Sequence, residues 1–206
     1  MSSRHVAGAP GPTTASYDAD IIILTIDRID ETLAAIASAD GQTGVTAHVF
    51  VLDQGSDAQG LARLRYAVAD KPNITLLVSG ENLGVAGGRN LLSGLGQGRI
   101  IIGLDNDATF ATPDTAARLV RALDAEPRLA AIGCRILTKC GSTDDLSSWG
   151  YPAGLRPLAA ESFDTVTFVG AGHAIRRAAW AQAGGYDSAL FFCWEEYDFY
   201  LRAIAL

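Results

Sequence analysis

The chain has 206 residues, enough for one domain or for one domain with a fragment of another. Hydrophobic residues make up 49% and charged residues 19%, which is typical of a globular protein and excludes a disordered chain. Its 16 lysines and arginines against 23 aspartates and glutamates give a net charge of -7. This charge disfavours a nucleic-acid binder, because such affinity needs many positive side chains. No stretch of about 18 apolar residues predicts a transmembrane segment.

Three cysteines, Cys134, Cys140 and Cys193, lack the spacing of a metal site, and no export signal precedes them. We therefore expect reduced thiols and a cytoplasmic protein. Peripheral contact with the inner face of the membrane stays open, although no basic amphipathic helix requires it.

The expected elements alternate between strand and helix. Residues 1–17 are rich in Ser, Thr, Ala, Gly and Pro, so we expect a disordered tail followed by one folded domain over 18–206. Short apolar runs predict strands at 21–24, 49–52, 74–78, 100–104, 131–137 and 166–169. Helical spacing predicts helices after Asp30 and Ser56 as caps, from Thr112-Pro113 onward, and from about 195 to 206. This alternation predicts an α/β three-layer sandwich with a mainly parallel central sheet.

The last predicted helix has no stop signal. Either it ends the protein, or the chain is a truncated part of something longer. Between residues 138 and 161 the apolar residues follow neither helical nor strand spacing, which predicts a long loop. Such loops are often functional.

Polar clusters follow three of the predicted strands, at the edge where open parallel sheets bind ligands. They comprise residues 53–57, 81–90 and 105–107. Asp53 can accept a hydrogen bond from a base or a ribose, and a role in the turn explains it about as well. Asp105 and Asp107 place two carboxylates in one site, which is costly unless a cation or hydrogen bonds compensate. A divalent ion that bridges to a diphosphate would supply this compensation.

Gly84, Gly87 and Gly88 lead into a helix and let the backbone approach a phosphate, with the helix N-terminus as an anion site. Arg89 is interpreted either as a bidentate partner of a phosphate or as a solvated surface arginine. The glycines do not follow G-x-G-x-x-G, which excludes a Rossmann dinucleotide site.

Glu195 and Glu196 open the last predicted helix. They suit either the positive end of the helix dipole or the role of a rigidly held general base. Asp198 and Arg202 are four residues apart and predict a structural ion pair on the same helix.

Together these residues resemble the family-two inverting glycosyltransferases of GT-A fold, bacterial rhamnosyltransferases among them, over nearly everything after residue 18. The resemblance is carried by Thr25-Ile-Asp27, residues 53–57, residues 81–90, residues 104–107, Gly170-Ala-Gly172, Ile175-Arg176-Arg177, Gly184-Gly185-Tyr186-Asp187 and residues 195–202. Each piece is common alone, and their order and spacing are specific.

The resemblance implies a hexosyltransferase with a nucleotide-diphosphate sugar donor and a carbohydrate or lipid-linked acceptor. The donor-binding residues it implies are Thr25, Asp27, Asp53, Asn82, Gly88, Arg89, Asp105 and Asn106. Asp105 and Asp107 would hold Mg2+ or Mn2+, which neutralises charge on the leaving group. Glu196 inherits the role of base, and Glu195 is the alternative. Gly170 and Gly172 would let the acceptor-side loop approach the sugar.

Three other functions are alternatives to this one. A nucleotidyltransferase would need a basic, Gly-rich loop near the first strand, which residues 25–31 lack. A phosphatase with an Asp-x-Asp nucleophile would carry that pair after the first strand, whereas here it follows the fourth. A non-catalytic or truncated module that binds a nucleotide sugar stays open. Rhamnose, galactose and glucose are all compatible donor sugars, and surface polysaccharide or glycoconjugate synthesis is the expected process.

Overall fold

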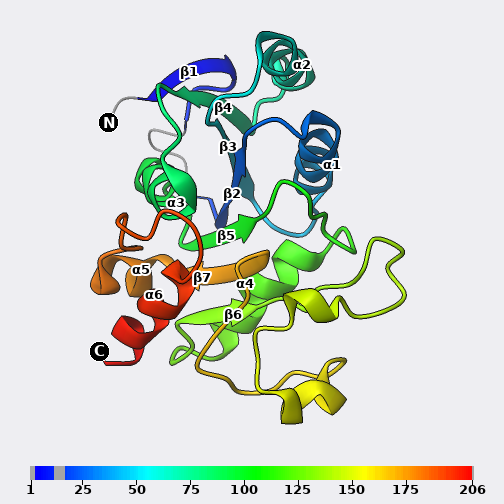
Figure 1. The fold of residues 1–206 in the computed structure, drawn as a ribbon, viewed down its shortest axis with the longest axis vertical. Helices are drawn as coiled ribbons and strands as arrows, with labels where there is room; N and C mark the ends of the chain where they lie inside the picture. The colour runs from blue at the N-terminus through cyan, green and yellow to red at the C-terminus, as the bar shows by residue number, and fades with distance from the viewer. Residues whose placement is uncertain (1–2, 12–16, 206) are drawn as a thin grey trace.

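The computed structural model describes residues 3–11 and 17–205, and within them the strands form a seven-stranded mixed sheet (Figure 1). In chain order the strands are β1 Ser3–Gly8, β2 Ala19–Thr25, β3 Ala47–Asp53, β4 Ile74–Ser79, β5 Ile100–Leu104, β6 Ala131–Gly133 and β7 Gly172–Arg176. Across the sheet the order is β1-β4-β3-β2-β5-β7-β6. The central strands β4, β3, β2 and β5 are parallel, while β1, at one edge, and β7 are antiparallel to their neighbours.

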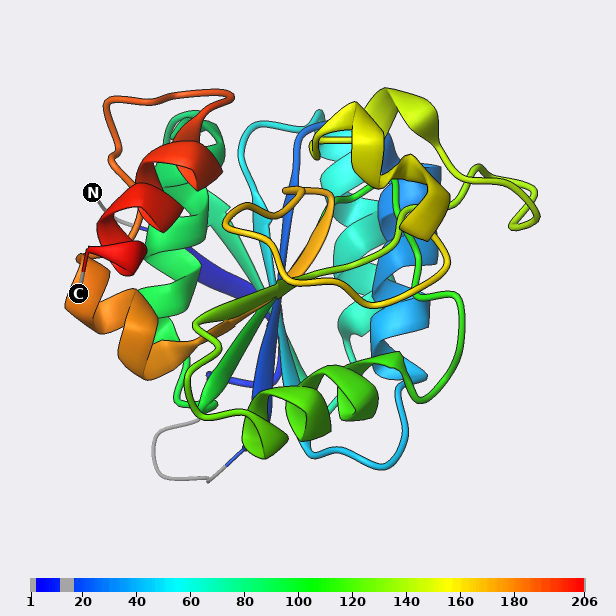
Figure 2. The same cartoon turned by 90° about the horizontal axis from the view of Figure 1, so that it is seen from below.

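Helices cover both faces of the sheet, as Figure 2 shows. They are α1 Ile29–Asp40, α2 Ala58–Val68, α3 Gly84–Leu95, α4 Thr115–Ala125, α5 Arg177–Ala183 and α6 Glu195–Ile204, with short 3-10 turns at Leu146–Ser148 and Ala153–Leu158. The core has two parts: α1, α2 and α4 pack on one face, and α3, α5 and α6 pack on the other. Ile21 and Ile23 of β2 enter the first part and Ile22 the second, which explains the continuous apolar run. The predicted three-layer sandwich is confirmed.

The N-terminal region differs from the predicted disordered tail. Ser3–Gly8 pairs antiparallel with β4, and Val6 and Ala7 pack against the core. Its backbone hydrogen bonds and two apolar contacts hold this edge strand, although its composition resembles a linker. Residues 1–2 and 12–16 of the predicted tail lie outside the described residues.

The predicted first and last residues of two strands are wrong. The stretch 166–169 forms no strand in the described part of the chain; the strand begins three residues later, where Gly172 faces Leu104 of β5. The strand predicted at 131–137 is only three residues long, because it pairs with β7 over Ala131–Gly133 alone. Phe168 is buried nonetheless, which explains the strand-like sequence pattern.

Helix starts also differ from the predicted caps. Asp57, and not Ser56, caps α2 by accepting a hydrogen bond from Gly60 N at 2.6 Å. Arg28, in a left-handed conformation, occupies the cap position of α1, and α4 begins at Thr115. The helix predicted from about 195 is confirmed as α6.

None of the helices in residues 3–11 and 17–205 is long and apolar enough to cross a bilayer.

Candidate active site

The parallel strands bring the predicted polar clusters to one edge of the sheet. Thr25 and Asp53 end β2 and β3 as direct partners in the ladder. Asn106, just after β5, donates from Nδ2 to Thr32 Oγ1 at 3.1 Å and lies 3.5 Å from Thr25 Oγ1. Thr25 and Thr32 share a 2.7 Å hydrogen bond, so a buried hydroxyl pair links the ends of β2 and β5.

A hydrogen bond connects the turn after β2 to the turn after β3. Asp53 is buried, and its Oδ1 accepts hydrogen bonds from Ser56 N at 3.0 Å and Gly55 N at 3.3 Å. Ser56 Oγ in turn accepts from Asp27 N at 2.7 Å, where Asp27 has a left-handed φ of 54°. Asp53 therefore shapes its turn, and the Asp27 side chain stays exposed at the rim.

At the N-terminus of α3, where the sequence predicted an anion site, protein groups accept hydrogen bonds from the amides of residues 83–85. Leu83 N donates to Gln54 Oε1 at 2.9 Å and Gly84 N to Asn82 Oδ1 at 2.9 Å. Val85 N donates to the carbonyl of Phe191 at 2.8 Å. Asn82 thus forms a turn, and a loop that precedes α6 covers this end of the helix.

Gly88 serves packing in this structure. A Cβ at this position would lie 2.9 Å from the Leu24 side chain, so glycine lets α3 sit close to β2.

Arg89 is neither the solvated surface arginine nor the free phosphate partner that the sequence allowed. Its side chain is only 5% exposed, and Nη2 donates to Asp105 Oδ1 and to the carbonyl of Gly170, both at 2.9 Å. Its Nη1 donates to Glu196 Oε1 at 3.0 Å and lies 3.6 Å from Glu195 Oε1. One buried guanidinium therefore gathers the carboxylate after β5 and the two carboxylates of α6.

The two glutamates at the start of α6 differ in exposure. The Glu195 side chain is 3% exposed, and its Oε2 is buried with no hydrogen-bond partner among the described residues. Burial, and next the charge of Glu196, raise the pKa of Glu195 to about 7. Glu196 is 12% exposed. The positive φ values of Cys193 and Trp194 turn the chain sharply into this helix.

The carboxylates after β5 interact with each other and with α6. Burial raises the pKa of Asp105; Arg89 opposes this shift, and the charges of Asp107 and Glu196 add to it. Asp107 is 43% exposed, and its Oδ2 accepts a 2.8 Å hydrogen bond from Arg28. The two aspartates are therefore neighbours in one site.

Asp105 and Asp107 suit a cation that is also bound by a diphosphate better than a metal site made of protein ligands alone. Within residues 3–11 and 17–205, no three His, Cys, Asp or Glu side chains lie close enough to hold a metal ion. Mg2+ is commonly held by one or two carboxylates together with substrate phosphates. The donor set of Asp105 and Asp107 suits that arrangement.

His173 and Tyr186 pack beside the Arg89 cluster. His173 bonds the Gly170 carbonyl through Nδ1 at 3.0 Å, and its Nε2 lies 3.4 Å from Tyr186 Oη. Burial, and next the charge of Arg89, lower the pKa of His173 to about 3, so this ring is a neutral packing group. Gly103 of β5 leaves the space that this ring fills. A glycine inside an apolar strand is a sequence signal of such close packing.

The predicted Asp198–Arg202 ion pair is present at 2.6 Å. Arg202 also bonds the carbonyls of Ala183 and, at 2.6 Å, Gly185. The pair therefore ties α6 to the end of α5.

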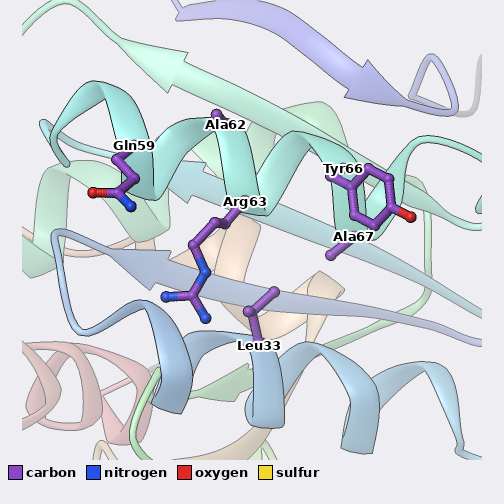
Figure 3. Close-up of a pocket in the computed structure, with 6 residues that line it drawn as sticks. All are labelled: Leu33, Gln59, Ala62, Arg63, Tyr66 and Ala67. Atoms are coloured by element: carbon purple, nitrogen blue, oxygen red, sulfur yellow. The ribbon is translucent and has the colours of Figure 1, made fainter.

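A pocket elsewhere in the molecule contains none of the predicted site residues. It lies between α1 and α2 and is lined by Leu33, Gln59, Ala62, Arg63, Tyr66 and Ala67 (Figure 3). Arg63 reaches across it to Asp30 at 2.5 Å. Its lining offers a single charged group, so the polar edge of the sheet is the better candidate.

The mixed sheet with helices on both faces has the GT-A fold, and two solved glycosyltransferase-class structures share it. A mannosyltransferase from Pyrobaculum calidifontis, solved with GDP-Man and Mn2+, aligns with a TM-score of 0.63 at 20% identity over 87% of this chain and 50% of that one. TarS 1-349 from S. aureus aligns with a TM-score of 0.68 at 16% identity over 90% of this chain and 55% of that one.

The family model for glycosyl transferase family 2 matches residues 20–183. An uncharacterized protein of Haemophilus influenzae is 30% identical over 80% of this chain and 90% of that protein. The succinoglycan biosynthesis protein ExoO of Rhizobium meliloti is 35% identical over 52% of this chain and 30% of that protein. The chain therefore belongs to glycosyl transferase family 2 and is a glycosyltransferase. It spans about half the length of the solved structures that it matches.

Proposed function

We propose that this domain transfers a sugar from a nucleotide-diphosphate donor to an acceptor hydroxyl, with inversion at the anomeric carbon and with a divalent cation. One observation carries the proposal: Arg89 holds Asp105 and Glu196 on the same guanidinium. A donor-side carboxylate and a candidate base are thereby fixed within one small site, as in-line transfer requires.

The donor would lie across the ends of β2, β3 and β5. Thr25, Asp53 and Asn106 are polar residues at this edge, and the Asp27 side chain is exposed at its rim. Asn82 and Gly88 would contribute indirectly, by shaping the turn and the packing of α3. Asp105 and Asp107 would hold Mg2+ or Mn2+, which when bound offsets the charge of the departing diphosphate.

Glu196 is the better candidate for the base. It is the more exposed of the two glutamates and is oriented by Arg89, whereas the carboxylate of Glu195 is shielded from an acceptor. Glu196 would take the proton of the acceptor hydroxyl as the new bond forms at the anomeric carbon and the bond to the diphosphate breaks. Gly170 fits this role, because any side chain there would overlap Glu196 Oε1.

The finer assignments are also proposals. One structural neighbour was solved with GDP-Man and Mn2+, and another, TarS 1-349, was solved in complex with UDP-GlcNAc. The ExoO name supports a role in polysaccharide synthesis, with a carbohydrate or lipid-linked acceptor. A cytoplasmic location, with contact at the inner face of the membrane, remains a prediction.

A non-catalytic nucleotide-sugar-binding module is the second candidate, because the chain spans about half the length of the solved structures it matches. Release of nucleoside diphosphate from a panel of nucleotide sugars, with Mn2+ and either water or simple sugars as acceptor, separates the two. Wild type should release nucleoside diphosphate from one of the donors. Glu196→Gln should bind the same donor but form nucleoside diphosphate at least about 100-fold more slowly. Donor binding without release in the wild type would favour the module.

A further inference from the structure

We propose that Arg28 is a built-in counter-ion of Asp107, which a divalent cation displaces when it binds. This inference rests on the proposed function, because it concerns the same metal site. Arg28 Nη1 donates to Asp107 Oδ2 at 2.8 Å. The guanidinium therefore occupies one carboxylate oxygen that the metal would need.

The backbone aims this side chain at Asp107. Arg28 has a left-handed φ of 48°, which an arginine adopts at a cost. Its carbonyl accepts hydrogen bonds from both Thr32 N and Thr32 Oγ1 at 3.0 Å. On its other side, Asp27 N is held by Ser56 Oγ. The start of α1 is therefore fixed, while the side chain beyond it is 54% exposed.

The two aspartates have counter-ions of opposite kinds. Asp105 is paired with Arg89, which is 5% exposed and bonded to three acceptors, so it cannot leave without stranding buried carboxylates. Asp107 is paired with Arg28, whose side chain is 54% exposed. The geometry makes Asp107 the carboxylate that exchanges its partner, and Asp105 the one that keeps it.

Arg28 also has an alternative partner once it is displaced. Its Nη2 lies 3.9 Å from Glu31, one turn along α1. Exposed ion pairs contribute about 0.2–1 kcal/mol, which corresponds to about 1.4- to 5-fold in an equilibrium constant. A divalent ion can therefore compete with Arg28, and the competition should weaken the binding of metal in the absence of donor by that factor.

The test is a titration of the purified chain with Mn2+ alone, followed by the electron paramagnetic resonance signal of free Mn2+. Arg28→Gln should bind Mn2+ about 1.4- to fivefold more tightly than wild type, and the gain should shrink as salt screens the charge. Arg99→Gln is the matched control: Arg99 is similarly exposed and paired with Asp18 and Asp124, but it lies just before β5, at the opposite end of the parallel strands. It should change Mn2+ affinity by less than about 1.2-fold.

Four outcomes overturn the inference. Equal Mn2+ affinity in Arg28→Gln and wild type would show that Arg28 does not compete. An equal gain in Arg99→Gln would assign the effect to net charge. If Mn2+ binds neither protein, with or without a nucleoside diphosphate, the metal-dependent function fails together with the inference. Loss of binding in Asp107→Ala, with no gain in Arg28→Gln, would reject the inference and leave the proposed function standing.

Discussion

Arg89 connects parts of the chain that are far apart in sequence. Its acceptors follow β5, precede β7 and begin α6. The Glu195 and Glu196 side chains are only 3% and 12% exposed, so removal of the Arg89 charge leaves buried carboxylates uncompensated. Its structural role and its proposed functional role are therefore the same: it holds Asp105 and Glu196 together.

Arg89→Met should lower the free energy of unfolding by about 3–5 kcal/mol, because it strands a buried cluster of negative charge. Urea denaturation in metal-free buffer measures this change. Arg128→Gln, at a side chain that is 93% exposed, is the control and should stay within about 0.5 kcal/mol of wild type. A loss below about 1 kcal/mol in Arg89→Met would mean that the buried network does not support the fold.

Glu195 should make stability depend on pH. Its pKa is raised to about 7 in the folded state, so the folded chain binds this proton more tightly than the unfolded chain does. Stability therefore falls as pH rises from about 4.5 to about 7 and is constant above that range, as far as this group is concerned. Glu195→Gln should remove this loss and raise stability at pH 8 by about 1–3 kcal/mol, with the gain vanishing near pH 4.

Urea denaturation of metal-free protein at several pH values checks this dependence. Glu126→Gln, at an exposed glutamate, is the matched control and should show no such trend. A stability difference between Glu195→Gln and wild type that is the same at pH 5 and pH 8 contradicts the explanation.

Single-residue roles were only partly predictable from sequence. The ion pair of Asp198 and Arg202 follows from helical spacing, which is local. The partners of Arg89 are between 16 and 107 residues away in the chain, so no local pattern contains them. Arg28 was missed for the same reason, since Asp107 lies 79 residues further on.

At the scale of elements, the loop before α6 covers the start of α3. The Phe191 carbonyl accepts the Val85 amide, and Gly84, with a φ of 69°, packs against the same residue. The loop thus couples the helix that carries Arg89 to the helix that carries the candidate base.

Two glycines of α3 should respond in opposite ways to substitution. Gly84→Ala should lower the free energy of unfolding by about 2 kcal/mol or more, because its Cβ would overlap the Phe191 carbonyl in a left-handed conformation. Gly94→Ala meets open space in the same helix and should raise it by about 0.5–1 kcal/mol. Thermal or urea unfolding of both variants measures this. A stable Gly84→Ala would show that the loop does not close over the helix as described.

Whole elements were predictable where the burial pattern was simple. The runs 21–24, 49–52, 74–78 and 100–104 are buried on both faces, and they became β2 to β5. β1 was missed because an edge strand needs few apolar residues. β7 was misplaced because Phe168 is buried outside any strand, so its burial looked like sheet pairing.

At the scale of the whole molecule, the order of the strands creates the candidate site. Parallel β2, β3 and β5 end at one edge, and antiparallel β7 brings residues 170–172 back beside Asp105, whose amide donates to the carbonyl of Ala171 at 3.1 Å. The first turn of α6 then places Glu195 and Glu196 beside Arg89 at the same edge. The sequence predicted the layers and the edge of the sheet that carries the site. It did not predict that residues 170–172 and the start of α6 complete the site, because long loops bring them there.

The proposed function depends most on a cation and a diphosphate binding among these carboxylates. The most direct measurement is the melting temperature of the chain with nucleoside diphosphates, with Mn2+ or with EDTA, because a ligand that binds only the folded state raises it. One nucleoside diphosphate should stabilise the wild type only when Mn2+ is present, and Asp107→Ala should lose this shift while Glu196→Gln keeps it. Equal stabilisation in EDTA, or an unchanged shift in Asp107→Ala, would contradict metal-dependent donor binding at this site.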